Sequence, residues 1–252
     1  MRSLKNFILS STIVVLTACG GGGGDSEIAR MNPSGLYSGN VNGKPFTVLI
    51  TEELETYAIT PTGLGVDKSM IINGNQISIP SLKVIEFSPV ALKGGSASAT
   101  VSEKSSITGV VKVNGEADTS FTLKYNPAYD TPTPIFAGFY AGQVAGSPDG
   151  KRAYSSNANF TIAKDGSIAG ASEGCTFRGN ITTTSKTYSK IVVVFGTESF
   201  CLVPGQTLSG IASGNNGQVV FVIENANALF FGASGVGPAS TIFNSSFGSQ
   251  AQ

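Results

Sequence analysis

The sequence predicts an all-β protein: two similar small antiparallel β-barrel or sandwich domains of about eight strands each. Three observations lead to this prediction. Glycine accounts for 32 of 252 residues, and Val, Ile, Thr and Phe lie between the glycines, a composition typical of short strands joined by tight turns. Strand-like segments recur about every 8–12 residues, and one short motif occurs twice. No segment has the pattern of an amphipathic helix.

Residues 1–18 have the pattern of an export signal. Arg2 and Lys5 give a positively charged start, and Phe7 to Leu16 form an apolar stretch that is shorter than the roughly 20 residues of a membrane-spanning helix. The signal ends in Leu-Thr-Ala-Cys19, which resembles the lipobox of bacterial lipoproteins. That resemblance implies cleavage before Cys19 and acylation of Cys19, which would anchor the chain to a membrane. The alternative is an ordinary signal peptide that happens to contain a cysteine.

A flexible tether is expected over residues 19–33. Gly20 to Gly24 are consecutive glycines, and no packed element tolerates so much backbone entropy. A glycine run after the lipidated cysteine resembles outer-membrane lipoproteins of Gram-negative bacteria, and the residue after Cys19 is not the aspartate associated with inner-membrane retention. The resemblance implies the outer membrane, and we expect display at the cell surface. The balance of 16 basic and 16 acidic residues gives no electrostatic footprint for nucleic acid.

A repeat divides the rest of the chain. Gly35-Leu-Tyr-Ser-Gly-Asn-Val41 matches Gly138-Phe-Tyr-Ala-Gly-Gln-Val144. Between the copies, residues 125–134 contain three prolines, which disfavour both a helix and a central strand. The expected division is therefore a first domain, a linker, a second domain and a C-terminal tail, at residues 34–125, 126–135, 136–233 and 234–252.

Strands are expected between turn signals such as Asn42-Gly43 and Asp165-Gly166. In the first domain they lie at residues 36–42, 45–51, 55–60, 69–72, 75–79, 83–87, 97–103, 106–113 and 119–125. In the second they lie at residues 138–144, 153–163, 167–171, 174–182, 188–196, 207–213, 217–223 and 227–232. The apolar run Ile191–Phe195 predicts a central strand covered on both faces. Glycines inside strands predict sharp bends at barrel corners, at Gly39, Gly109, Gly142, Gly170 and Gly179.

A single duplicated barrel of sixteen strands that crosses a membrane is the competing architecture. A lipid anchor with a tether makes it redundant, and most of the expected strands are too short to cross a bilayer.

Two cysteines remain after Cys19 is assigned to lipid. Cys175 and Cys201 are an even number in an exported chain, so we expect one disulfide between them. Redox-active pairs favour closer spacing, and a zinc site needs more ligands than this chain offers.

The sequence offers little catalytic chemistry. It contains no histidine, which excludes Ser-His-Asp and Cys-His catalysis within the chain. Gly170-Ala-Ser172-Glu-Gly174 matches the nucleophile-elbow motif, but it lies between expected strands and is expected to be a hairpin turn. Glu52, Glu53 and Glu55 form the densest acidic cluster; it is interpreted as a solvated turn, with paired carboxylates for glycoside hydrolysis as the alternative. We therefore expect no catalytic, cofactor or metal residue.

Phe230 and Phe231 are adjacent in an expected strand. Neighbouring side chains of a strand point to opposite faces, so one ring should face outward. The pair is a candidate contact patch for a protein partner, with an interface between the two domains as the alternative.

Several motifs, most of them in the second half of the chain, carry a resemblance to a known group of proteins. The segments 166–170, 174–179 and 201–210, with the Gly-x-Tyr-x-Gly openings and Tyr125-Asn-Pro-Ala-Tyr129, resemble Gly-rich outer-membrane lipoproteins of proteobacteria. The repeated Gly-flanked strands are also similar in architecture to the barrels of transferrin-binding-protein-B-like surface lipoproteins. The second resemblance implies surface display and binding of a protein or haem carrier. The expected function is thus non-enzymatic: binding of a protein or small ligand, or a structural role in the envelope. The alternative is a periplasm-facing hydrolase or an assembly or inhibitor factor.

Overall fold

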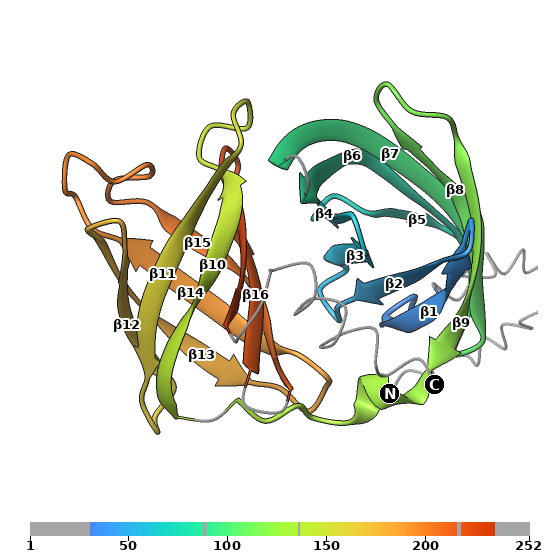
Figure 1. The fold of residues 1–252 in the computed structure, drawn as a ribbon. Helices are drawn as coiled ribbons and strands as arrows, with labels where there is room; N and C mark the ends of the chain where they lie inside the picture. The colour runs from blue at the N-terminus through green and yellow to red at the C-terminus, as the bar shows by residue number, and fades with distance from the viewer. Residues whose placement is uncertain (1–30, 88–89, 136, 216–217, 235–252) are drawn as a thin grey trace, which may run out of the picture.

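In a computed structural model, the protein folds into two closed eight-stranded antiparallel barrels (Figure 1). The structure describes residues 31–87, 90–135, 137–215 and 218–234. The expected signal and tether, with Cys19, and the C-terminal tail beyond residue 234 lie outside these ranges. Among the described residues, no strand of one barrel pairs with a strand of the other. The all-β prediction of two similar barrels is therefore confirmed, and the single duplicated barrel is wrong.

The first barrel runs around the ring in the order β4-β3-β2-β1-β9-β8-β7-β6, and pairing of β4 with β6 closes it. The short strand β5 pairs only with one end of β6. The register of β6 against β7 shifts between Ile79 and Leu82, where Pro80 has no N–H to donate. The strands are β1 Gly35–Val41, β2 Lys44–Ile50, β3 Thr56–Thr60, β4 Gly63–Asp67, β5 Ile71–Asn73, β6 Gln76–Phe87, β7 Val90–Ser102, β8 Ser106–Val113 and β9 Thr119–Asn126.

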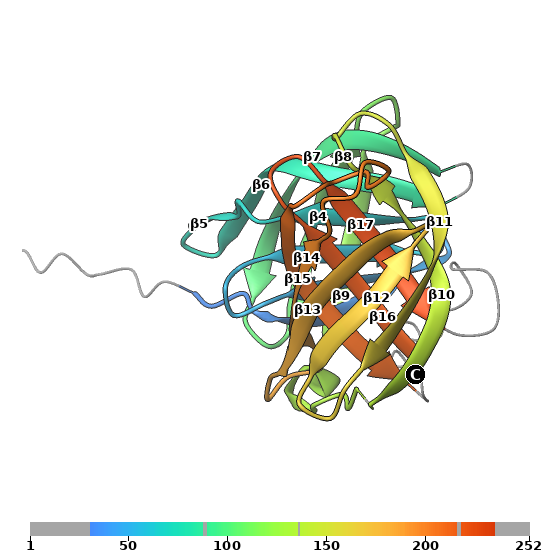
Figure 2. The ribbon, with the colours of Figure 1, turned by 90° about the vertical axis from the view of Figure 1, so that its left-hand side faces the viewer.

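The second barrel is a simple up-and-down meander, closed by pairing of its first and last strands (Figure 2). Seven of its eight strands begin and end within two residues of the expected ranges, and β10 runs three residues further. They are β10 Gly138–Ser147, β11 Tyr154–Ile162, β12 Ser167–Ser172, β13 Cys175–Thr183, β14 Ser189–Phe195, β15 Thr207–Asn215, β16 Gln218–Glu224 and β17 Leu229–Ser234.

The repeated motif forms the equivalent strand in each barrel. In the first copy Gly35 pairs with Ile50, and in the second Gly138 pairs with Ile162. Both motif strands also pair with the last strand of their own ring. The repeat therefore marks a structural duplication, which places β1–β4 and β6–β9 in correspondence with β10–β17.

The first barrel differs from its expected strands in three places. One is β7, which begins at Val90, seven residues before the expected start at residue 97. The strand β4 was not expected, because Gly63-Leu-Gly-Val-Asp67 has two glycines and no strong strand signal. The segments expected at 75–79 and 83–87 are one long strand, β6, that continues through its irregularity. The differences at β4 and β6 reflect tertiary pairing, since these two strands hydrogen-bond to each other to close the ring.

The outer faces of the two barrels pack against each other through a shared apolar cluster. Leu49, Tyr57 and Val66 from the first barrel and Val222 and Phe231 from the second are each less than 3% exposed within it. Strands β4 and β16 are consequently buried on both faces, apart from the half-buried Gln218 and Phe221 of β16. The expectation that Ile191–Phe195 is such a strand is wrong: β14 alternates, and Val192 is 42% exposed on its outer face.

The contact patch expected at Phe230 and Phe231 is not present on the surface. Phe231 is 1% exposed and lies in the interface between the barrels, where its ring centroid is 4.7 Å from that of Phe87. Phe230 is 7% exposed and points into the second barrel. The interface between domains, the alternative interpretation, describes Phe231, because packing between the barrels covers the outward ring.

The proline-rich segment packs between the barrels. Pro127–Asp130 forms one turn of 3₁₀ helix, capped by Asn126, whose side chain accepts a hydrogen bond from the Ala128 N–H at 3.0 Å. The prolines do not exclude this turn, because proline is tolerated at the first helical position. Tyr129 is 3% exposed, and its carbonyl accepts from the Thr187 N–H at 2.9 Å. In the described part of the chain, no helix is long and apolar enough to span a membrane.

Candidate ligand cavity in the second barrel

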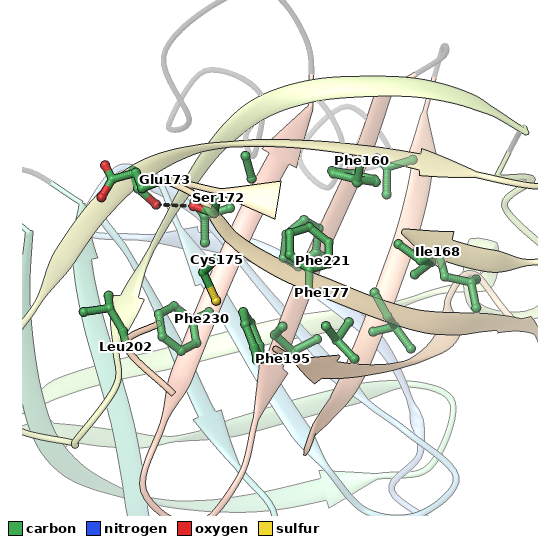
Figure 3. A pocket seen from close by; sticks show the side chains of 18 of the residues that line it. Phe160, Ile168, Ser172, Glu173, Cys175, Phe177, Phe195, Leu202, Phe221 and Phe230 are labelled. Carbon is green, nitrogen blue, oxygen red and sulfur yellow. Dashed lines mark hydrogen bonds between the residues drawn. The ribbon is translucent and has the colours of Figure 1, made fainter. Parts of the chain in front are cut away.

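The interior of the second barrel holds a cavity of about 190 Å³. Its lining is mostly aromatic and aliphatic, because alternate residues of every strand point inward. Five phenylalanines, each from a different strand, surround it (Figure 3): Phe160, Phe177, Phe195, Phe221 and Phe230. The cavity is therefore an aromatic-walled chamber.

Two glycines make room for these rings. A Cβ on Gly170 would lie 2.6 Å from the Phe160 Cβ and 2.7 Å from the Phe177 Cζ. Gly232 pairs with Phe221 across β16 and β17, and a Cβ there would overlap the Phe221 ring. The rings of Phe160 and Phe221 are nearly perpendicular, with centroids 6.0 Å apart and an interplanar angle of 83°, a favourable aromatic arrangement. The sequence thus places bulky rings opposite residues without side chains.

The mouth of the cavity lies between a hairpin and a loop. The turn from β12 to β13 is Glu173-Gly174, with φ values of 49° and 88°, the left-handed conformation of a tight hairpin turn. Loop 196–206 carries Phe200 and Leu202, which line the cavity and are 59% and 48% exposed. The cavity thus opens to solvent past two apolar side chains.

A disulfide joins the two sides of this mouth. Cys175, the first residue of β13, is bonded to Cys201, which lies between Phe200 and Leu202. This is the pair expected from the sequence. Glu198 reaches back from the same loop, and its carboxylate accepts hydrogen bonds from the Thr176 hydroxyl at 2.5 Å and the Thr176 N–H at 3.3 Å. Hydrogen bonds from Thr176 are the main reason that the pKa of Glu198 lies below its usual value.

Cys175, Glu198 and Cys201 are the group of potential metal ligands found in the described part of the chain. The two sulfur atoms are bonded to each other, so neither is a thiolate that could bind a metal ion. The arrangement holds the loop against the hairpin.

Ser172 of the nucleophile-elbow motif lies at the rim of the cavity. Its hydroxyl is 2.8 Å from the Ser156 hydroxyl and donates to the Asn157 carbonyl at 2.9 Å. The motif forms the end of β12 and its hairpin turn, as expected from the sequence. Ser172 therefore offers a polar contact at the mouth, next to the Glu173 carboxylate (Figure 3).

The acidic cluster lies away from this cavity, on the loop between β2 and β3. Glu55 is 3.2 Å from Lys68 and accepts from the Tyr57 hydroxyl at 2.8 Å, within the first barrel. Glu52 lies 3.5 Å from Lys186 of the second barrel, and Glu53 pairs with Lys190 of that barrel. The interpretation as a solvated turn is confirmed, since residues 52 and 53 form an exposed turn and the side chains of Glu52 and Glu53 are 55% and 47% exposed. The sequence did not indicate that these two carboxylates also bridge the barrels.

The cavity was not predicted from the sequence. The available signal was a phenylalanine at inward positions of several consecutive strands, with glycine or alanine on the neighbouring strand. These residues indicate a cavity only when the register between strands is known, and the register cannot be derived from the sequence alone.

No protein-family model and no curated protein matches the chain. Among solved structures, it is similar to the crystal structure of the isotype 1 transferrin binding protein B from serogroup B Neisseria meningitidis, with 9% sequence identity and a TM-score of 0.32. The aligned region covers 76% of this chain and 58% of that chain. A TM-score this low carries no argument about function.

Proposed function

We propose that the chain is a lipid-anchored binding protein of the bacterial outer membrane, displayed at the cell surface, and that its second barrel holds a small apolar molecule. The observation that carries the proposal is the aromatic-walled cavity of about 190 Å³. Eight-stranded barrels have room for one small ligand. The export signal and lipobox at Cys19 support the location.

The chemistry of the walls defines the ligand. Phenylalanine rings offer dispersion contacts and flat faces but no hydrogen bonds, so a polar molecule would lose its hydration without compensation. An engineered apolar cavity of about 150 Å³ in another protein stays dry and binds benzene. A cavity of about 190 Å³ therefore suits a molecule with one or two fused rings, or an alkyl-substituted ring. A polar group on the ligand would sit at the mouth, beside Ser172 and Glu173.

A binding role has more support than a hydrolytic one. The Ser172 hydroxyl contacts another hydroxyl and a backbone carbonyl, and the chain contains no histidine to act as its base. The carboxylates of Glu52 and Glu53 are engaged by lysines at the interface between the barrels. The side chains considered as catalytic groups, Ser172, Glu52 and Glu53, thus have structural partners.

A titration with indole and n-butylbenzene tests the ligand. The protein begins at residue 19 with Cys19→Ser and carries ¹³C-labelled methyl groups. We expect both compounds to shift the methyl signals of Ile168, Ile191 and Val193, which line the cavity. The variant Ala158→Phe places a ring inside the cavity and should abolish these shifts.

The matched control is Thr161→Phe. Thr161 lies on the same strand, β11, but on its exposed outer face, so this variant should bind like the unchanged protein. Absence of shifts in the unchanged protein, or equal shifts in Ala158→Phe, would contradict the proposal.

Protease treatment of intact cells tests the location. Degradation of the chain without lysis would support surface display. Complete protection in intact cells, with degradation after lysis, would place the protein inside the envelope instead.

A further inference from the structure

Three polar side chains line the mouth of the cavity in the second barrel. Ser156 of β11 and Ser172 of β12 are half-buried and belong to the alternate residues of their strands that face the interior. Glu173 follows Ser172 at the exposed hairpin turn. The other side chains that line the cavity are apolar or belong to the disulfide. These three residues therefore decide which polar group of a bound molecule can be accommodated.

The two serine hydroxyls form a directed chain of hydrogen bonds. Their oxygen atoms are 2.8 Å apart (Figure 3), and the Ser172 hydroxyl donates to the carbonyl oxygen of Asn157 at 2.9 Å. A hydroxyl has one hydrogen to donate and two lone pairs that accept. Because Ser172 gives its hydrogen to Asn157, the hydrogen between the two serines comes from Ser156. Both hydroxyl hydrogens are thus used within the protein.

Lone pairs are what this mouth offers to a ligand. The Ser156 oxygen accepts no hydrogen bond among the described residues, so both of its lone pairs are available. The carboxylate of Glu173 also accepts hydrogen bonds and, when ionised, donates none. Among the side chains that line the cavity there is consequently no free donor. A carbonyl or ether oxygen of a ligand would lose its hydration here and gain no hydrogen bond from a side chain.

We propose that the molecule held in the second barrel carries a hydrogen-bond donor, an N–H or O–H group on its apolar ring system, and that this group donates to the hydroxyl oxygen of Ser156. The inference rests on the function proposed for this barrel and narrows the ligand to a chemical class, aromatic N–H compounds and phenols. The ring system lies among the phenylalanines, and the donor lies at the mouth. The negative charge of Glu173 disfavours an anionic ligand there.

The test compares indole with benzofuran, which have nearly the same shape, but indole has an N–H where benzofuran has an oxygen atom. Both are titrated into the same methyl-labelled chain, and the signals of Ile168, Ile191 and Val193 report binding. The double variant Ser156→Ala, Ser172→Ala removes both hydroxyl oxygens. We expect it to weaken indole binding about three- to tenfold, the effect of one lost hydrogen bond. Benzofuran should bind the variant as tightly as the unchanged protein.

Ser155→Ala is the matched control, because Ser155 is the neighbouring serine of β11 and is exposed on its outer face. This variant should bind both compounds like the unchanged protein, and thermal unfolding verifies that each variant is folded. The inference is overturned, while the cavity remains a binding site, if the double variant weakens indole no more than benzofuran. If neither compound shifts the signals of the unchanged protein, the function proposed for the barrel fails, and the inference fails with it.

Discussion

Single glycines determine how closely neighbouring strands approach in both barrels. At Gly179 of β13, a Cβ would overlap the carbonyl oxygen of Val192 on β14, and at Gly109 of β8 it would lie 2.5 Å from the Ala99 Cβ and also overlap a backbone oxygen. These contacts involve backbone atoms, which cannot move aside without disturbing the strand pairing. The sequence predicted sharp bends at these glycines; what the structure shows at Gly109 and Gly179 is close approach of the neighbouring backbone.

We predict that Gly179→Ala destabilises the second barrel by about 1–3 kcal/mol, as overpacking does elsewhere. Gly138→Ala is the control, since a Cβ at Gly138 meets nothing within 4 Å and should leave the stability unchanged or slightly raised. Urea unfolding followed by circular dichroism measures both. Equal effects of the two substitutions would show that close approach is not the cause.

A second prediction at the residue scale concerns the lipidation of Cys19. If Cys19 is acylated, Cys19→Ala removes the acceptor, and the signal stays uncleaved by the lipoprotein peptidase. Metabolic labelling with a palmitate analogue should mark the unchanged protein and not the variant. Labelling that persists in Cys19→Ala would assign the lipid to another residue.

At the scale of elements, the disulfide connects the β12–β13 hairpin to the loop between β14 and β15. This loop carries Phe200 and Leu202 over the mouth of the cavity. Glu198 adds hydrogen bonds to Thr176 on β13. The mouth is therefore held from two sides, while the loop itself contributes no strand.

We predict that the double variant Cys175→Ala, Cys201→Ala destabilises the second barrel by about 3 kcal/mol, the chain-entropy value for a cross-link spanning 26 residues. The first barrel contains no cysteine among its residues, so its unfolding should change little. Methyl signals from each barrel, followed during urea unfolding, separate the two transitions. An equal loss in both barrels would mean that they unfold as one unit.

At the scale of the whole molecule, the interface between the barrels combines an apolar cluster with ion pairs at its edge. Glu224 is 4% exposed and lies 2.9 Å from Lys83 of the first barrel. Glu53 and Lys190 pair on the loop side of the interface, with side chains 47% and 50% exposed. The packed segment around Tyr129 adds a third contact, so the connection between the barrels is itself part of the interface.

The Glu53–Lys190 pair predicts a pH dependence. Burial acts to raise the pKa of Glu53, but the hydrogen bond from Lys190 and further hydrogen bonds lower it overall, below its ordinary 4.5. The hydrogen bond to Glu53 raises the pKa of Lys190 above its ordinary 10.5. The contribution of Glu53 is therefore complete above its unfolded pKa and is lost as the pH falls through the lower folded pKa. That of Lys190 is lost only as the pH rises through its raised value.

Glu53→Gln should thus lower the urea midpoint at pH 7, and the difference from the unchanged protein should disappear as the pH falls below 4.5. Because both side chains are about half exposed, the effect at pH 7 should stay below about 1 kcal/mol. Glu103→Gln is the control, since no ion pair of Glu103 is found among the described residues. A Glu53→Gln effect that stays constant with pH would rule out the pair as its source.

Separate expression of the two halves tests their independence. Residues 30–130 and 134–238 each contain one complete ring of strands, so we expect both to be β-rich and to unfold cooperatively. Each fragment alone exposes its half of the shared cluster, so mixing them should raise both unfolding midpoints. Disorder of both fragments alone, with folding only on mixing, would show that neither barrel is stable without the other.

The sequence by itself determined the all-β class, the duplication and nearly all strands of the second barrel, because turn dipeptides and alternating side chains act locally. It also predicted the Cys175–Cys201 bond, from cysteine number in an exported chain. Only the tertiary structure decided which apolar faces are covered. Val192 faces solvent and Phe231 does not, although both lie in apolar strands. Whether an outer face is covered depends on packing between the barrels, and the shape of the cavity depends on the register between strands. Both involve residues far apart in the sequence, so no local stretch determines them.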